Sequence, residues 1–428
     1  MPSAKQLKTV QSIAKPPFIT GVVRKRNLRA LAWQVKNQPG GEPILIDEQE
    51  LFEFKNCIRF YESELKKLSK LFAGGNAKQI KAKQDAIGNS FRCSMVAVLV
   101  WAERYGKKLS KLDIYSIAEQ VKFSNKCHEK IGSKIEARNN GGFRTVSVFK
   151  KLRRSRAIIG GDLFSICSPY NPYEFNRSKH GSKKAITIVR LKIAEGYKYW
   201  VVLDIKNAYP SVRRGHCKEL AIMSKWTIDA LCPYRVNYKT TPKKAAQTAL
   251  PQGMASSPTV LSALVGQALS ILPEQLVRLN YSDDLLIGAQ SIGELEKAVE
   301  VLEKHFASLK SGPLHFGKVD YVDLNTNKGI KYLGYLVTVD CFTKEVRIRP
   351  APKTFDRHWR KQHAAAVKKF EEGYDYELVM SRIEENCISW LGQFPLWKYN
   401  ETSINIFEIQ RLQVVHDAWF DFSHSKTY

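Results

Sequence analysis

Three aspartates stand at the ends of apolar runs in this sequence. Asp204 is near the end of the run 199–205, and Asp283 and Asp284 follow the run 276–281. An ionised carboxylate that ends a buried strand is costly unless it is paired or binds a metal, and two adjacent acids repel each other. Oxygen ligands without nearby histidine or cysteine select hard ions. The pattern therefore predicts a Mg²⁺ site, with Mn²⁺ as an alternative.

Such a site has a defined chemistry. Two divalent ions about 4 Å apart suit an in-line displacement at phosphorus. One ion would activate an attacking 3′-hydroxyl, and the other would neutralise the leaving pyrophosphate. An aromatic-x-Asp-Asp string alone is weak evidence, so the interpretation depends on the elements that carry the acids.

The middle of the chain alternates between strand and helix patterns. Residues 199–205 predict a buried strand, and residues 276–287 predict a hairpin with carboxylates at its turn. Between and after them, residues 257–272 predict a buried helix and residues 292–309 an amphipathic one. This order predicts an α/β (α+β) arrangement in which the acids collect at one edge of a sheet.

The flanking regions read differently. The first 120 residues are mainly helical, for example over 48–72 and 86–105. The turn signal at 139–142 leads into a strand over 143–149, which a basic helix over 152–159 follows. From about residue 337 the pattern predicts helices again, with many basic residues.

The charge balance indicates a polyanionic partner. Among 428 residues, 68 Lys and Arg against 41 Asp and Glu leave a net charge of +27. Such an excess opposes compaction unless a polyanion neutralises it, which predicts salt-dependent nucleic-acid binding. A basic protein without that partner is the alternative. Residues 143–192 hold 12 Lys or Arg against two acids, with aromatics interleaved, which suits phosphate neutralisation and base stacking.

Other features bear on compartment. The eight cysteines include no Cys-x-x-Cys pair, so we predict neither a zinc site nor a disulfide framework, and expect a reducing, cytoplasmic location. The longest apolar run, 95–102, is too short to span a bilayer, so no membrane partner is expected. The first 41 residues hold eight Lys or Arg and no acid, like a mitochondrial transit peptide. A basic arm that contacts nucleic acid is the alternative.

Four ordered motifs carry a family resemblance. Asp204 is followed five residues later by Tyr209, then come Leu-Pro-Gln-Gly-Met-Ala-Ser-Ser-Pro at 250–258, Tyr-Ser-Asp-Asp at 281–284 and Tyr-Leu-Gly at 332–334. This series closely resembles the palm of reverse transcriptases. The resemblance is convincing over about residues 140–336 and fades outside.

The resemblance implies roles for the acids and their neighbours. Asp204 and Asp283 would bridge two Mg²⁺ ions, Asp284 would support one of them, and the backbone carbonyl of Ile205 would be a further ligand. Lys318 falls about where the family places a lysine that can protonate the leaving pyrophosphate. A surface lysine without that role is the alternative.

The resemblance also implies substrate contacts. Tyr209 would be the steric gate that excludes a ribose 2′-hydroxyl, although a core aromatic is the alternative. Gln252, Gly253 and Tyr281 would lie against the incoming nucleotide, with Gln252 and Gly253 also near the template base, and glycine permits close backbone approach. Arg144 looks like the arginine that such enzymes aim at the triphosphate; an exposed strand arginine is the alternative.

The implied architecture is a right-hand polymerase with an N-terminal helical extension. Residues 1–120 would be that extension, 121–198 the fingers, 199–336 the palm with its antiparallel sheet, and 337–428 the helical thumb or C-terminal region. Within the palm, Tyr332, Leu333 and Gly334 would form the primer grip.

The resemblance implies an RNA-directed DNA polymerase that uses dNTPs, an RNA template and a DNA primer or product. No ribonuclease H, protease, integrase, His-Asn-His nuclease or retron-specific string is found. The outline is similar to the bacterial defence-associated reverse transcriptases, which commonly copy a companion non-coding RNA to protect against phage. A retron-like or group II intron-like enzyme is the first alternative. An RNA-dependent RNA polymerase or an inert nucleic-acid-binding protein is the second. The priming mechanism and oligomeric state stay open.

Overall fold

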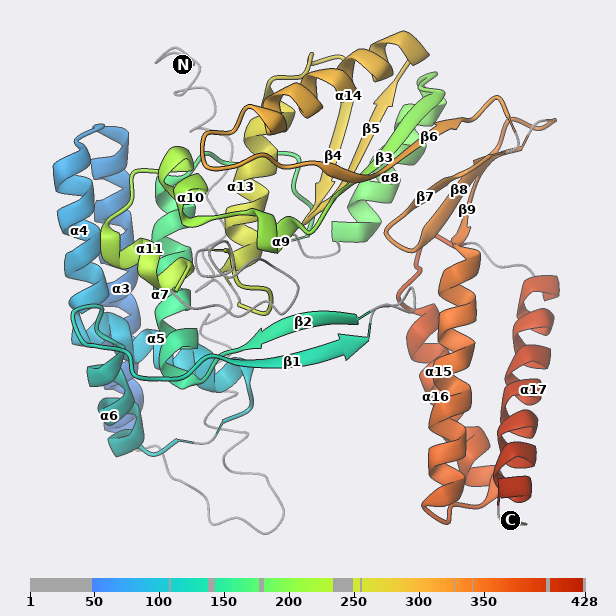
Figure 1. The fold of residues 1–428 in the computed structure, drawn as a ribbon. Helices are drawn as coiled ribbons and strands as arrows, with labels where there is room; N and C mark the ends of the chain where they lie inside the picture. Colours follow the sequence, from blue (N-terminus) through green and yellow to red (C-terminus); the bar gives the residue numbers. More distant parts are fainter. Residues whose placement is uncertain are drawn as a thin grey trace. The chain divides into compact units, whose positions relative to one another are not determined.

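The computed structural model describes residues 48–107, 109–137, 143–176, 181–233, 249–254, 256–326, 328–340, 342–397 and 401–425. They belong to two compact units (Figure 1). The first unit takes its described residues from 1–173, 205–272 and 301–317, and the second from 174–204, 273–300 and 318–428. The three aspartates all belong to the second unit.

The N-terminal helices of the first unit are separated by polar caps. They are α3 (Glu48–Ala73), α4 (Ala77–Asn89), α5 (Phe91–Arg104), α6 (Lys111–Val121) and α7 (Lys151–Cys167). The prediction of one helix over 86–105 is wrong, because Ser90 has extended backbone angles and ends α4. The Ser90 hydroxyl instead accepts from the backbone N–H of Cys93 and starts α5.

Helix α5 forms the centre of this helical layer. Residues 93–102 are all buried, and α3, α6 and α7 each pack against α5. The hydroxyl of Tyr61 on α3 donates to the buried carboxylate of Asp162 on α7 at 3.0 Å. This bond satisfies a carboxylate that would otherwise be costly to bury, and so ties the two helices together.

The rest of the first unit consists of a hairpin and short helices. Strands β1 (Gly132–Ala137) and β2 (Phe143–Val148) pair antiparallel, which confirms the strand predicted over 143–149. The predicted turn at 139–142 lies outside the described residues. The remaining helices are α9 (Ala208–Ser211), α10 (Arg214–Leu220), α11 (Lys225–Leu231) and the buried α13 (Ser257–Ser270), the last as predicted.

A four-stranded sheet carries the acids. Its strands are β3 (Tyr199–Ile205), β4 (Val277–Tyr281), β5 (Asp284–Ala289) and β6 (Phe316–Asp323), in the order β4-β5-β3-β6. Strand β5 pairs antiparallel with both β3 and β4. Gly288 on β5 is required here, because a Cβ atom would lie 2.7 Å from the Trp200 ring on β3. The strand and the hairpin predicted for this region are confirmed.

A second, three-stranded sheet and two helices accompany the first. Its strands are β7 (Ile330–Tyr332), β8 (Tyr335–Val339) and β9 (Val346–Pro350); the helices are α8 (Gly181–Ala194) and α14 (Ile292–Ala307). One buried cluster joins residues of α8 and of both sheets, among them Ile186, Trp200, Leu286, Tyr335 and Val337. Helix α14 is amphipathic, as predicted.

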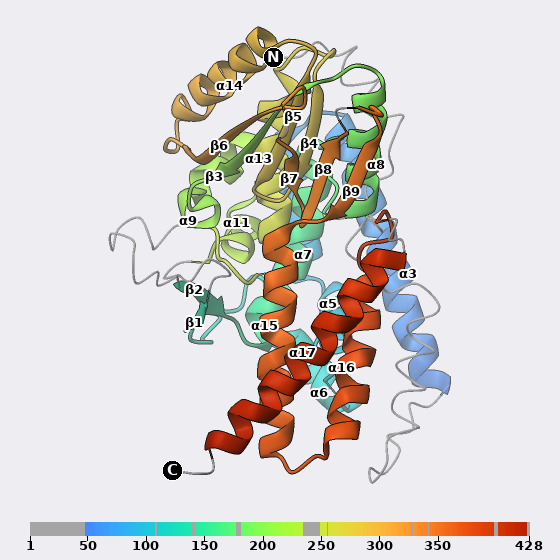
Figure 2. The ribbon, with the colours of Figure 1, turned by 90° about the vertical axis from the view of Figure 1, so that its right-hand side faces the viewer.

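The C-terminal segment of the second unit is a bundle of three helices (Figure 2). They are α15 (Pro352–Glu371), α16 (Tyr376–Leu391) and α17 (Glu401–Ser425), and each packs against the other two. The prediction of helices from residue 337 is wrong for 337–350, where alternating side chains form β8 and β9. Among the described residues, no helix combines the length and apolarity needed to cross a bilayer.

These elements confirm the predicted fold class. An antiparallel sheet carries acids at the ends of its central strands, and helices form both the N-terminal layer and the C-terminal bundle. The arrangement is a mixed α/β fold, consistent with a right-hand polymerase.

Candidate active site

The sheet brings Asp204 and Asp284 together. They are register partners on the antiparallel strands β3 and β5, so their Cα atoms face each other across neighbouring strands. Tyr281 pairs with Asp284 from the other side, and Asp283 lies in the turn that joins β4 to β5. The predicted collection of three acids at one sheet edge is therefore present.

The turn itself has an unusual backbone. Ser282 and Asp283 form a two-residue connection between β4 and β5, and Ser282 has a φ of 61°. Two-residue hairpins favour turn types with positive φ, because their twist matches that of the strands. The side chain of Asn280 donates from Nδ2 to the carbonyl of Ser282 at 2.7 Å. A tight turn thus presents Asp283 beside the strand that begins with Asp284.

Electrostatics link the three carboxylates. Burial, together with the smaller effects of the Asp283 and Asp204 charges, raises the pKa of Asp284 to about 7, while Lys318 acts in the opposite direction. Like charges this close cannot all ionise without cost. A cation among them would relieve both the repulsion and the desolvation of Asp284.

The donor set fits hard divalent cations. All three side chains offer only carboxylate oxygens, the ligands that Mg²⁺ and Mn²⁺ prefer. In the described part of the chain, however, no group of three or more His, Cys, Asp and Glu side chains is arranged closely enough to hold a metal ion. The backbone thus places the acids next to one another, but their carboxylate oxygens are not arranged to coordinate one metal ion. Ile205 ends β3, and its part as a carbonyl ligand stays a prediction.

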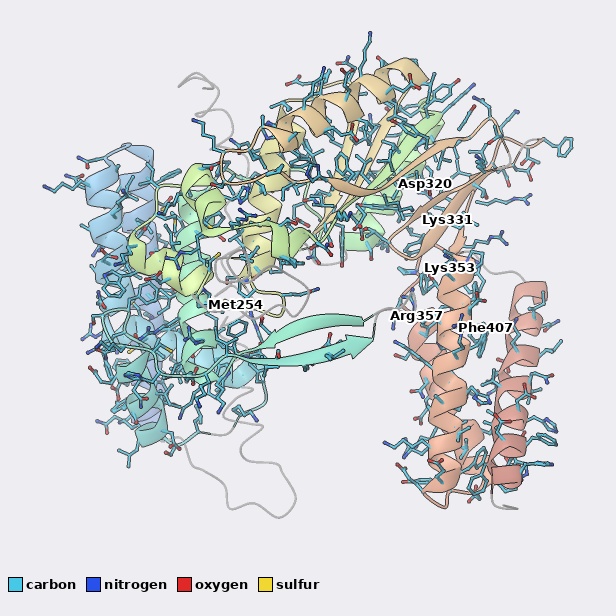
Figure 3. All side chains as sticks on the ribbon, in the orientation of Figure 1. Met254, Asp320, Lys331, Lys353, Arg357 and Phe407 are labelled. Atoms are coloured by element: carbon cyan, nitrogen blue, oxygen red, sulfur yellow. The ribbon has the colours of Figure 1, made fainter. Side chains whose placement is uncertain are left out.

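Lys318 lies on β6, the strand next to β3 in the sheet order. Its side chain is 49% exposed and pairs with Asp320 at 3.2 Å (Asp320 is labelled in Figure 3). Its charge nevertheless lowers the pKa of Asp284, so it is close to the acidic edge. The geometry agrees with a lysine near the reacting phosphates, and equally with a surface ion pair.

The predicted primer grip is a hairpin turn that contacts the acidic edge. Leu333 and Gly334 join β7 to β8 with φ values of 51° and 82°. The hydroxyl of Tyr332, a residue only 3% exposed, donates to the carbonyl of Asp284 at 3.4 Å. The carbonyl of Gly334 accepts from the backbone N–H of Ala351 at 2.8 Å. This hairpin therefore links the acidic edge to the start of α15; contact with a primer stays a prediction.

One neighbouring acid was missed in the sequence. Glu174 precedes the second unit's first helix, and its charge raises the pKa of both Tyr281 and Tyr332, after the larger effect of burial. Glu174 also forms a parallel β-bridge with Asn280. Nothing in its surrounding sequence indicates that it lies beside the hairpin, because the bridge joins residues more than 100 positions apart.

The other predicted substrate contacts belong to the first unit. Tyr209 lies half-buried on α9, just after Asn207, whose φ is 49°. The carbonyl of Gln252 accepts from the N–H of Ser147 on β2 at 3.0 Å. Gly253 has a φ of 100°, and a Cβ there would lie 2.8 Å from Val146. The positive φ and the close approach of Val146 therefore explain why a glycine occupies position 253. Its contact with a nucleotide stays a prediction.

The basic residues before and on α7 are only partly available to a ligand. Arg144 lies on β2 opposite Glu136, but its side chain is outside the described part of the structure. Arg156 donates to the carbonyls of Gln120, Val121, Lys122 and Asn125. Arg153 donates from Nε to the carbonyl of Glu129 at 2.9 Å. Two of the three arginines on this helix thus stabilise a loop of the protein itself.

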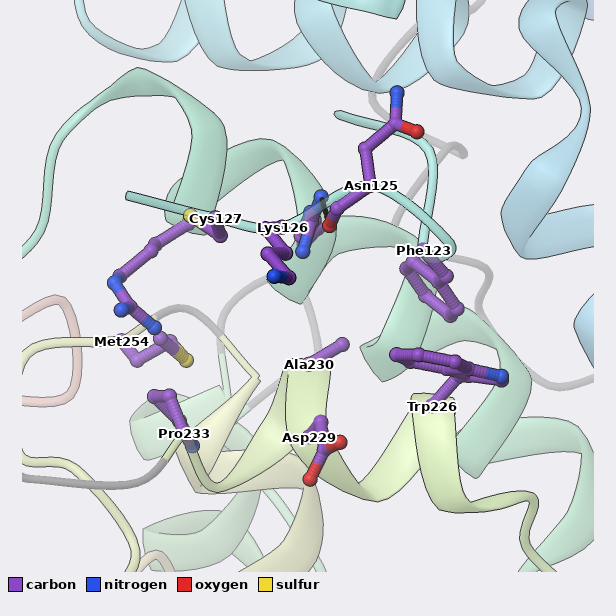
Figure 4. A pocket seen from close by; sticks show the side chains of 11 residues that line it. Phe123, Asn125, Lys126, Cys127, Trp226, Asp229, Ala230, Pro233 and Met254 are labelled. Carbon is purple, nitrogen blue, oxygen red and sulfur yellow. Dashed lines mark hydrogen bonds between the residues drawn. The ribbon is translucent and has the colours of Figure 1, made fainter. Parts of the chain in front are cut away.

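A cavity of about 370 Å³ lies beside this helix in the first unit (Figure 4). Its lining combines aromatic, basic and apolar side chains: Phe123, Asn125, Lys126, Cys127, Arg153, Arg156, Trp226, Asp229, Ala230, Pro233 and Met254. None of them is a site residue predicted from the sequence. Because Arg153 and Arg156 are already bonded to backbone carbonyls, the cavity does not compete with the acidic edge as the site of chemistry.

Comparisons with known proteins agree with the motif pattern. Residues 137–337 match the family model described as reverse transcriptase (RNA-dependent DNA polymerase). This segment contains all three acids and the β7–β8 turn, and is slightly less than half of the chain. The chain matches no curated protein by sequence.

Two solved structures illustrate the structural similarity. Telomerase from Candida albicans, in complex with a TWJ fragment of telomeric RNA, shares 9% identity at a TM-score of 0.37. The match covers 68% of this chain and 60% of that one. Apo telomerase from Candida tropicalis, truncated from its C-terminal domain, shares 14% identity at a TM-score of 0.33, covering 51% and 54% of the two chains. The chain thus spans less than two thirds of either.

Proposed function

We propose that this chain, in which residues 137–337 are the reverse transcriptase domain of an RNA-directed DNA polymerase, copies an RNA template into DNA by two-metal nucleotidyl transfer. The observation that carries the proposal is the pairing of Asp204 with Asp284 across β3 and β5, with Asp283 in the adjoining turn. A divalent cation bound among these acids would offset their mutual repulsion.

Reverse transcriptase domains use divalent metal ions. Here Asp204 and Asp283 would hold both Mg²⁺ ions, with Asp284 and the carbonyl of Ile205 as further ligands; Mn²⁺ is an alternative. When bound, these ions supply Lewis acidity at the reacting phosphate and lower the pKa of the attacking 3′-hydroxyl. The chain's own contribution is to hold the acids in register. Tyr332 supports it by its hydroxyl contact with the Asp284 carbonyl.

Other residues of the matched segment would select and hold the substrates. In this proposal Tyr209 excludes the 2′-hydroxyl, Gln252 with Gly253 lies against the template base and the dNTP, and Arg144 reaches the triphosphate. The turn that follows Tyr332 positions the primer end. Support comes from the match of the family model over this whole segment.

The nucleic-acid partner would bind through basic surfaces, of which α15 is one. Exposed cations recur along this helix: Lys353, Arg360, Lys361 and Lys368, with half-buried Arg357 between them (Lys353 and Arg357 are labelled in Figure 3). Phosphate contacts from such a row favour binding of an RNA template and DNA product at low salt. We assign residues 1–120 to an N-terminal extension, 121–198 to the fingers, 199–336 to the palm and 337–428 to the thumb region.

The biological role is a further part of the proposal. We propose that the enzyme acts in the cytoplasm of a bacterium in defence against phage, with a structured non-coding RNA as template. Its support is the similarity in sequence outline to the defence-associated reverse transcriptases. Sequencing the RNA that co-purifies with the protein from its native cell would test this. A retron RNA or an intron RNA in its place would favour the alternative.

Primer extension on an RNA template tests the activity. Wild-type protein should extend a DNA primer with dNTPs and Mg²⁺, and the double variant Asp283→Ala, Asp284→Ala should not. The matched control Asp417→Ala, Asp421→Ala removes two exposed acids from α17 and should extend like the wild type. Full synthesis by the first double variant would remove the proposed site. Extension with rNTPs alone would favour an RNA polymerase.

A further inference from the structure

Asn280 is a buried polar side chain next to the turn that carries Asp283. It lies on β4, pairs in register with Leu285 of β5, and is fully buried at 0% exposure. Burying an amide is costly unless hydrogen bonds satisfy it. Its partners therefore indicate what the side chain stabilises.

The side-chain bond of Asn280 crosses the turn. Nδ2 donates to the carbonyl of Ser282 at 2.7 Å, and this carbonyl belongs to the peptide that joins Ser282 to Asp283. The bond thus fixes the peptide plane from which the backbone of Asp283 starts. Ser282 has a φ of 61°, a left-handed conformation that residues other than glycine adopt reluctantly. The bond across the turn helps to hold this conformation.

The backbone of Asn280 is held on its other side. The N–H of Phe175 donates to the carbonyl of Asn280 at 2.9 Å, and Glu174 forms a parallel bridge with Asn280. The carboxylate of Glu174 accepts from the N–H of Asn176 at 2.6 Å, which stiffens this segment. Strand β5 pairs with one edge of β4, and residues 174–176 lie along the other. The backbone that carries the Asn280 amide is therefore held on both sides.

We propose that Asn280 is a positioning residue of the active site, whose amide holds the Ser282–Asp283 peptide and so sets the Asp283 carboxylate relative to Asp204 and Asp284. The inference rests on the proposed function, because it concerns the same three acids. It predicts that loss of the Asn280 amide weakens metal binding by the acids more than it weakens binding of nucleic acid.

The test compares Asn280→Ala with a matched control, Asn171→Ala. Asn171 is also buried, and its Nδ2 donates to the carbonyl of Ser262 at 2.8 Å, but it is not on the hairpin. Mn²⁺ binding is measured by electron paramagnetic resonance on the protein with primer and template but without dNTPs. Asn280→Ala should raise the Kd for Mn²⁺ at least fivefold and lower kcat at least tenfold, with the KM for primer-template within twofold. Asn171→Ala should lower Tm while leaving the Kd unchanged. An unchanged Kd in Asn280→Ala would overturn the proposal.

A second residue, Ser282, gives an additional test of how the turn is held. Glycine adopts positive φ readily, so Ser282→Gly added to Asn280→Ala should recover at least threefold of the lost Mn²⁺ affinity. Ser282→Gly alone should keep its Kd within twofold, because Asn280 still holds the turn. A fivefold loss in the single variant, or no recovery in the double variant, would contradict the assignment.

The two levels of the argument can fail separately. If the Asp283→Ala, Asp284→Ala variant is inactive while Asn280→Ala binds Mn²⁺ like the wild type, only the role of Asn280 is wrong. If the aspartate variant still synthesises DNA, the proposed function itself is wrong.

Discussion

Asp204 and Asp284 face each other as register partners on β3 and β5, the two central, antiparallel strands of the four-stranded sheet. Selection for stability alone would not favour this arrangement, because the two charges repel and the Asp284 side chain is half-buried. This cost falls on acids that belong to two of the ordered motifs. Functional sites commonly retain such costs, which supports reading the edge as the centre of the chemistry.

Removing one of these charges should stabilise the metal-free protein. At pH 8, above the raised pKa of about 7, Asp284 is ionised at a cost in folding free energy. Asp284→Asn keeps the shape and removes the charge, so we expect a gain of roughly 1–2 kcal/mol, smaller than the full shift because water reaches part of the carboxyl. Thermal unfolding in EDTA measures the gain. The same variant should lose DNA synthesis by at least about a thousandfold.

The contrast with a peripheral acid makes that prediction specific. Asp417→Asn on α17 removes an exposed charge far along the chain from the sheet, and should change neither Tm nor synthesis appreciably. A lower Tm for Asp284→Asn in EDTA would mean that the carboxylate stabilises the fold instead of straining it.

The C-terminal bundle should lose stability in mild acid because of His358. This side chain is 4% exposed and stacks on Trp390 with ring centroids 4.3 Å apart. Burial, with a smaller effect of the Lys361 charge, lowers the pKa of His358 to about 4. Since the unfolded chain binds a proton at about pH 6.5 and the folded one does not, the stability contributed by neutral His358 is complete above that pH. It is lost progressively as pH falls towards 4.

The size of the acid effect can be measured with histidine variants. Between pH 6.5 and 4, protonation of His358 should lower the free energy of unfolding by at most about 3 kcal/mol. Chemical unfolding of wild type and His358→Gln across this range should show a flatter pH profile for the variant. His416→Gln, which changes an exposed histidine on α17, should keep the wild-type slope. Identical slopes in all three proteins would exclude His358 as the titrating group.

The parts of the fold that the sequence predicted are those where one pattern dominates. The run 199–205 and the hairpin at 276–287 could be recognised because apolar strands end in acids, and α13 because it is apolar throughout. Single polar residues were harder. Ser90 divides what the apolar pattern predicts as one helix, and strand β9 is a run of only five alternating residues directly before a long basic helix.

The acids of the candidate site could be predicted from the sequence, but the residues that hold them in place could not. Motif spacing identified Asp204 and the Asp283-Asp284 pair. Asn280, in contrast, is only a polar residue within an apolar strand pattern, and the sequence does not show its hydrogen bond. Its partners Ser282 and Phe175 could be known only from three-dimensional pairing. Likewise, the carbonyls that bind Arg156 lie at the end of α6 and just after it, more than 30 residues earlier, so the basic pattern of the helix did not show that the protein uses this guanidinium internally.

Sugar selection should depend on Tyr209. Its ring lies half-buried on α9, five residues after Asp204. Tyr209→Ala removes the ring that would exclude a 2′-hydroxyl, so incorporation of rNTPs relative to dNTPs should rise at least about tenfold, or roughly 1.4 kcal/mol. Single-nucleotide extension with each substrate measures the ratio. Tyr199→Ala, at the other end of β3, should leave the ratio unchanged, and equal ratios in both variants would remove Tyr209 from the gate.

Lys318 can be separated from its ion pair with Asp320 by changing each partner alone. If Lys318 donates a proton to the leaving pyrophosphate, Lys318→Ala should lower the single-turnover rate about 100-fold, the usual size of general-acid catalysis. Asp320→Asn breaks the same 3.2 Å ion pair but leaves the ammonium group of Lys318 in place. The rate should therefore stay within about threefold, since an exposed ion pair also contributes little to stability. Rapid-quench extension at saturating dNTP measures both. Equal, small losses in the two variants would identify Lys318 as a surface residue. A large loss in Lys318→Ala alone, with an altered pH dependence of the rate, would identify it as the acid.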